Sequence, residues 1–106
     1  MAKRESGFKD FVLDQLTDLR GLTCRAMFGG YGLSVRKTFF GIIHKDRLYF
    51  KVTPATVADY KKQGMKPFRV TSTMTLRTYY EIPPDILEDS ERLAQWAEVS
   101  IAESKK

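Results

Sequence analysis

Residues 27–33 read MFGGYGL and set three glycines in four positions between two runs of strand-forming residues. Glycine gives the backbone access to positive φ, which a tight hairpin or a bulge requires. It also lets a neighbouring segment approach where a side chain would block it. A phosphate-binding loop would lead from its glycines into a helix, whereas these glycines lead into a strand. The stretch therefore predicts a hairpin turn or a bulge.

The residues on either side of this turn predict an antiparallel meander. Residues 22–28 and 31–35 flank the glycines, and residues 38–43 and 47–52 follow after two further short turns. Short turns join only antiparallel neighbours. In the fourth strand the alternation of side chains places Tyr49 on the outward side, with the neighbouring aliphatic residues inward.

A helix is expected before the strands. Residues 6–20 repeat apolar side chains at spacings of three and four, which puts them on one helix face, Phe11 among them. Ser6 is the expected N-cap, and Gly21 is the expected residue just past the end.

A second helix and two more strands follow the meander. The helix is expected to be capped by Thr53, to have Pro54 in its first turn and to end before Gly64, because proline favours the start of a helix and glycine the position after it. Residues 67–71 and 74–82 are expected to form strands. In the second of these strands, alternation places four side chains on one face, namely Leu76, Thr78, Tyr80 and Ile82.

The last helix is expected to be capped by Asp89 or Ser90 and to bury a stripe that includes Trp96 and Ser100. The element order is then helix, four strands, helix, two strands, helix, in a single domain over residues 1–106. A parallel βαβ sheet would need strands and helices to alternate one by one, and in this order they do not. The expected fold class is therefore α+β, an antiparallel sheet of about six strands with helices mainly on one face.

The composition limits the classes of function. Cys24 is the single cysteine, which excludes an internal disulfide framework and a multi-cysteine metal site. With no secretory signal, a cytoplasmic location is expected. No run approaches the roughly 20 apolar residues of a membrane span. We expect no cofactor, no metal and no small-molecule substrate.

Cys24 and His44 are the one nucleophile and base that could meet on the sheet. Cys24 shares the apolar side of its strand with Phe28, which favours a buried, inert thiol. His44 is expected in a solvated turn, and one histidine cannot build a multi-histidine metal site. The acidic residues near the last helix are explained by capping and by the helix dipole. We therefore expect no catalytic residues.

The charge is distributed unevenly. Residues 21–80 carry eleven basic and two acidic side chains, a net charge of +9, whereas residues 81–106 have a net charge of −4. This asymmetry suits an anionic partner such as nucleic acid, or a solvated surface whose acidic tail cancels the field. Cations and aromatic rings on an open sheet hold single-stranded nucleic acids, and such a face also suits a dimer or a protein partner. The candidate surface comprises Arg25, Arg36, Lys37, Lys45, Arg47, Tyr49, Lys51 and Arg77.

Further motifs lie in register with the glycine-rich stretch at 27–33. They are DRLYFKV at 46–52, GMKPF at 64–68, YYEIP at 79–83 and LAQWA at 93–97. In this order and spacing, the five motifs resemble the TfoX/Sxy N-terminal domain family over nearly the whole chain.

The resemblance implies an α+β domain with an outline similar to secretion-chaperone folds, and a link to the transcriptional regulation of natural competence in bacteria. Full-length regulators of that family carry a second, C-terminal domain, so a stand-alone member is expected here. The family supplies no catalytic residues. We expect a small regulatory domain that acts by protein or nucleic-acid binding, with a protein partner or a homodimer. The alternative is a chaperone-like or adaptor module that binds a peptide on its sheet or along an edge strand.

Overall fold

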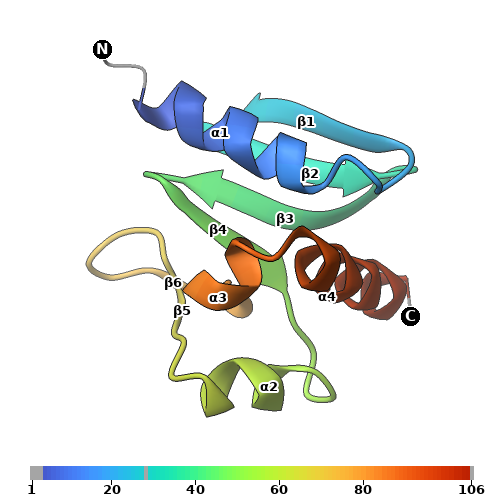
Figure 1. Cartoon of the computed structure of the whole chain (residues 1–106). Coiled ribbons are helices and arrows are strands. Elements are labelled where there is room, and N and C mark those ends of the chain that lie inside the picture. The colour runs from blue at the N-terminus through green and yellow to red at the C-terminus, as the bar shows by residue number, and fades with distance from the viewer. Residues whose placement is uncertain (1–3, 28, 106) are drawn as a thin grey trace.

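One antiparallel sheet with all its helices on a single face makes up the fold (Figure 1). The structure, a computed structural model, describes residues 4–27 and 29–105. The helices are α1 (Arg4–Gln15), α2 (Val57–Lys62), α3 (Pro84–Leu87) and α4 (Ser90–Ser104). The strands are β1 (Leu22–Met27), β2 (Gly30–Val35), β3 (Thr38–His44), β4 (Arg47–Lys51), β5 (Pro67–Arg69) and β6 (Thr75–Glu81), in the order β1-β2-β3-β4-β6-β5 across the sheet. The predicted α+β class and the six strands are confirmed.

Tight turns join the four strands of the meander. Residues 36–37, between β2 and β3, and residues 45–46, between β3 and β4, all have φ between 48° and 73°. Two successive positive φ values define a type I′ turn, whose twist matches that of the flanking strands. All pairs from β1 to β4 are antiparallel, so the predicted meander is confirmed.

The glycines of the MFGGYGL stretch are required by the turn and by close packing. Gly29 has φ +75°, a conformation that side chains disfavour. A Cβ on Gly30 would collide with the backbone carbonyl oxygen of Ile43 in the third strand. Phe28, predicted on the apolar side of its strand, lies outside the described residues. The predicted roles of glycine as a turn and as a point of close approach are both confirmed.

The main core lies between the helices and the covered face of the sheet. Phe40 of β3 and Phe50 of β4 are fully buried, with ring centroids 5.3 Å apart. Leu93 and Ala97 of α4 are also fully buried in this core. The helix is fastened by a polar contact as well, because the buried hydroxyl of Ser100 donates to the carbonyl oxygen of Lys51 over 2.8 Å. The predicted stripe of α4 is confirmed.

The first helix begins earlier than expected and ends sooner. It starts at Arg4, so Ser6 lies inside it and does not cap it, and residues 16–20 form turns. Val12 is fully buried, whereas Phe11 is 39% exposed. Adjacent positions on a helix point about 100° apart, so the two side chains cannot share one face.

The second helix begins at Val57, four residues after the expected cap. The carbonyl oxygen of Thr53 accepts from the backbone N–H groups of Thr56 and Val57, and its hydroxyl accepts from Ala55. These bonds form a separate turn ahead of the helix. Gly64 has φ +78° just beyond the helix, as predicted for the position after its end.

The last part of the chain contains one more helix than expected. Ile86 and Leu87, which the sequence pattern places in a short turn, belong to the short helix α3. Asp89 caps α4, with its carboxylate accepting from the N–H of Arg92 over 3.2 Å, as predicted. Within the described ranges, none of the helices combines the length and the apolar composition that a membrane span requires.

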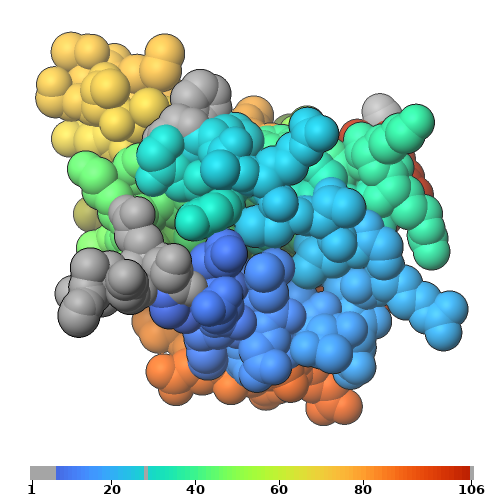
Figure 2. All heavy atoms as spheres, turned by 90° about the horizontal axis from the view of Figure 1, so that it is seen from above, coloured from blue at the N-terminus to red at the C-terminus, as the bar shows by residue number. Residues whose placement is uncertain are grey.

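Strand β6 bends sharply where it passes from β4 to β5. Against β5, its register jumps from Tyr80 opposite Pro67 to Leu76 opposite Phe68. The extra residues form a bulge, which bends the strand and increases its twist. Leu76 was expected on the same face as Tyr80, but it packs on the helix-free face, so that prediction is wrong. The connection between β5 and β6 stands out from one corner of the molecule (Figure 1 and Figure 2).

Replacing Gly30 by alanine should destabilise the domain by roughly 1–3 kcal/mol, because the backbone of β3 must move to admit a methyl group. Gly7→Ala is the matched control. An added Cβ there meets nothing within 4 Å, and alanine is favoured over glycine inside a helix by about 1 kcal/mol. Urea unfolding measures both free energies. A Gly30→Ala variant as stable as the parent would contradict this packing.

Candidate functional site

The eight residues of the predicted surface do not form one patch. Arg36 and Lys37 lie in the turn at one end of β3, and Lys45 lies in the turn at the other end. At the rise of a strand these two turns are roughly 25 Å apart. Arg25 is exposed on the edge strand β1, and Arg77 is exposed on β6 at the far side of the sheet. Their part in binding stays a prediction.

Two of the eight residues contact side chains of other strands of the sheet. The guanidinium of Arg47 donates to both carboxylate oxygens of Glu81 at 3.1 Å. Tyr49 is on the helix-free face but only 7% exposed, because the ring of Phe68 lies 4.4 Å from its ring. Burial, together with the negative charge of Glu81, raises the pKa of Tyr49, and Arg47 opposes that shift. Tyr49 therefore lies on the outward face, as predicted, but Phe68 covers it, so its ring is not open to solvent.

An apolar groove of about 310 Å³ opens between the bent β5–β6 hairpin and the helix-free face of the sheet. Its walls include Met27, Ile42, Phe68, Val70, Met74 and Leu76. Met74 is 53% exposed, the largest exposed fraction among the large apolar side chains of the described residues. Among the described residues that line it, none carries a carboxylate, an ammonium or a guanidinium group. Such a groove suits apolar side chains of another molecule.

None of the residues that line the groove is among the eight of the predicted surface. The sequence nevertheless carries a sign that the sheet has a second apolar face. Adjacent apolar residues in one strand, such as Ile42-Ile43 in β3 and Tyr49-Phe50 in β4, send one side chain to each face. A strand with such pairs is buried on both faces. This signal indicates a second apolar face, but it does not place Met74, which reaches the groove only because β6 bends.

Cys24 and His44 lie on opposite faces of the sheet. Cys24 packs against the core under the helices, and burial raises the pKa of its thiol, although Lys9 opposes that shift. His44 was expected in a solvated turn, but it is the last residue of β3 and lines the groove, with its ring 5.3 Å from that of Phe68. Across residues 4–27 and 29–105, no three His, Cys, Asp or Glu side chains gather into a metal site.

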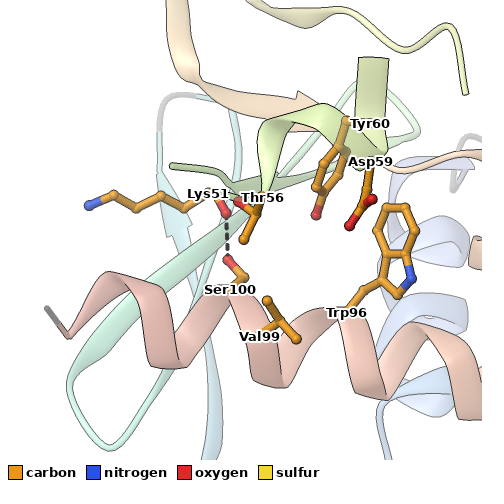
Figure 3. Close-up of a pocket in the computed structure, with 7 residues that line it drawn as sticks. All are labelled: Lys51, Thr56, Asp59, Tyr60, Trp96, Val99 and Ser100. Carbon is orange, nitrogen blue, oxygen red and sulfur yellow. Dashed lines mark hydrogen bonds between the residues drawn. The ribbon is translucent and has the colours of Figure 1, made fainter. Parts of the chain in front are cut away.

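A smaller cavity of about 80 Å³ lies between α2 and α4 (Figure 3). Tyr60 of α2 meets Trp96 of α4 edge-on, with ring centroids 4.8 Å apart. Lys51, one of the eight predicted residues, contributes its carbonyl oxygen, while its side chain points away from the cavity (Figure 3). Burial, and then the carboxylate of Asp59, raises the pKa of Tyr60 well above its ordinary value. The volume accommodates a few water molecules.

Tyr60 should make the domain sensitive to alkali. Because its folded pKa exceeds the unfolded value of 10.0, the native state keeps a proton that the unfolded state releases. The stability that this contributes is present below about pH 10 and is lost as pH rises beyond it, by up to about 1.4 kcal/mol per pH unit. Urea unfolding between pH 8 and pH 12 should show a smaller loss for Tyr60→Phe than for the parent. Parallel losses would contradict the burial of this phenol.

Comparison with known families assigns the domain. The sequence profile of the TfoX N-terminal domain matches residues 14–104, which include all six strands, the groove and α4. No curated protein matches the chain. The family match supports a regulatory kind of role and confirms the resemblance carried by the five motifs. The chain therefore belongs to the TfoX N-terminal domain family.

Proposed function

We propose that this domain exerts its regulatory role by binding a segment of another protein in the apolar groove, and not by catalysis. The observation that carries the proposal is the groove itself, about 310 Å³ in volume and walled by aliphatic, thioether and aromatic side chains. Met74, half-exposed in its lining, leaves apolar area in water that a partner would cover.

Charge complementarity specifies the chemistry of the partner. Arg25 precedes Met27 by two positions on β1, so both point to the same side of that strand. Lys45 directly follows His44, which lines the groove, and it is exposed. An apolar floor with cations beside it suits a segment that carries large apolar side chains flanked by aspartate or glutamate. The net charge of +9 over residues 21–80 favours the same partner.

Membership of the family suggests the class of protein to which the partner belongs. Regulation of natural competence, as the resemblance implies, would place the partner among transcription-control proteins of the bacterial cytoplasm. A chaperone-like or adaptor module is the second candidate, and the thioethers of Met27 and Met74 favour it, because methionine-lined surfaces adapt to several partners. The two differ in sequence tolerance: a regulator selects one segment, whereas an adaptor accepts many.

Synthetic 15-residue peptides can test the proposal directly. One series carries leucine anchors flanked by glutamate, a second has lysine flanks, and a third has aspartate in place of leucine. Calorimetry should give the tightest binding for the first series, with the second weaker by roughly tenfold or more. Amide shifts in the NMR spectrum should map to β3 and the β5–β6 hairpin. Shifts confined to other elements, or no shifts with any series, would refute the groove as the binding site.

Met74→Asp should weaken binding of the best peptide by roughly tenfold or more, because it places a carboxylate in the apolar lining. Val99→Asp is the matched control, since Val99 is 50% exposed on α4, far from the groove lining. The control should bind the peptide like the parent. Equal loss in the two variants would overturn the assignment. A concentration-dependent mass that only Met74→Asp abolishes would identify a second copy of the chain as the occupant.

A further inference from the structure

The β5–β6 hairpin has a second side, and that side is cationic. Lys66, Arg69 and Arg77 line a hollow of about 430 Å³ together with Pro67 and Thr75. All three cations are exposed. Along β5, Arg69 alternates with the groove residue Phe68, so the two side chains point to opposite sides of the hairpin. The projecting corner of the molecule is therefore apolar on one side and basic on the other.

None of the three cations forms an ion pair with a carboxylate of the described residues, although the backbone N–H of Glu81 donates to the carbonyl oxygen of Lys66. The hollow contains no carboxylate in its lining, and across the described ranges no carboxylate lies within ion-pair distance of any of the three. Arg69 pairs directly with Thr75, and Arg77 lies two positions further along the strand. Arg77 follows directly on the last regular pair, Leu76 with Phe68, and both arginines line the same hollow. Because two guanidinium groups border one hollow, their positive charges repel each other in the free protein.

We infer that this hollow binds the phosphate groups of a nucleic-acid backbone. Guanidinium groups match phosphate oxygens with paired hydrogen bonds, and the hydroxyl of Thr75 adds a further donor of the kind that contacts backbones. The hollow has no aromatic side chain in its lining, so bases find no ring to stack on, and recognition is independent of sequence. The hairpin projects from the body (Figure 2), which lets a long, stiff polyanion reach it. A bound phosphate also relieves the repulsion between the two arginines.

The salt dependence of DNA binding tests the inference. Fluorescence anisotropy of a labelled 20-bp duplex should show affinity falling with salt. Three phosphate contacts give a slope of log affinity against log salt of about −2.7, which is roughly a 40-fold loss between 50 and 200 mM. Arg69→Gln/Arg77→Gln should make this slope shallower by about 1.8 and weaken binding at 50 mM by roughly tenfold. Lys61→Gln/Lys62→Gln, an exposed pair on α2, removes equal charge and should leave both values unchanged.

A second readout separates binding from folding. The melting temperature of Arg69→Gln/Arg77→Gln should stay equal or rise, because the substitution removes a like-charge pair and no core contact. Equal loss of affinity in the hairpin variant and the α2 control would overturn the site. Displacement of the duplex by poly-glutamate as readily as by unlabelled duplex would overturn the assignment to phosphate. Met74→Ser, which changes the groove without changing charge, should leave DNA binding intact, so this inference and the peptide-binding proposal can fail separately.

Discussion

The contact between the rings of Phe68 and Tyr49, with centroids 4.4 Å apart, holds the bent hairpin on the helix-free face of the sheet. An aromatic pair of this kind contributes about 0.5–1.5 kcal/mol beyond the burial of its area. Ile42 joins the two rings in a second buried cluster, and Leu76 and Val70 pack against it. This cluster is the apolar base of the hairpin, and it helps to fix the positions of the groove and of the outward basic side.

The two faces of the sheet are built in different ways. On the covered face, α4 packs its buried stripe on Phe40 and Phe50, and Ser100 donates a hydrogen bond to the carbonyl oxygen of Lys51. This face is closed and well packed, which suits a scaffold. The other face has no helix and is covered only in part, by the hairpin. The groove that we propose as a binding site therefore lies on the side opposite the helices, on strands that the core holds rigid.

Because side chains alternate along the strands of the hairpin, its apolar and its cationic side chains point to opposite sides. Phe68 and Leu76 point to the groove, whereas Arg69 and Arg77 point to the basic hollow. In a strand this separation needs no extra structure, because successive side chains take opposite sides. A protein segment in the groove and a nucleic acid at the hollow would bind back to back on one hairpin, and they would not compete for the same side chains.

Much of the fold follows from short-range patterns in the sequence. The glycines of MFGGYGL, the spacing of apolar residues in α4 and the cap at Asp89 each act within a few residues, so they determined the turns, the last helix and the six strands. Five motifs in register indicated the family, which the match over residues 14–104 confirms. The boundaries of α1 and α2 were less certain, because turns of one or two hydrogen bonds at Thr53 and after Gln15 compete closely with a helix.

Only the tertiary structure decided where the apolar groove and the basic hollow lie. The bulge in β6 depends on how that strand pairs with β4 on one side and with β5 on the other. Pairing between strands that are distant in the chain produces no residue pattern of fixed spacing in the sequence. The bulge moves Leu76 to the other face, buries Tyr49 and gathers Arg77 with Lys66 and Arg69. The sequence alone predicted cations and aromatics on a sheet. Which of them meet was decided by the bend of a strand whose partners are distant in the chain.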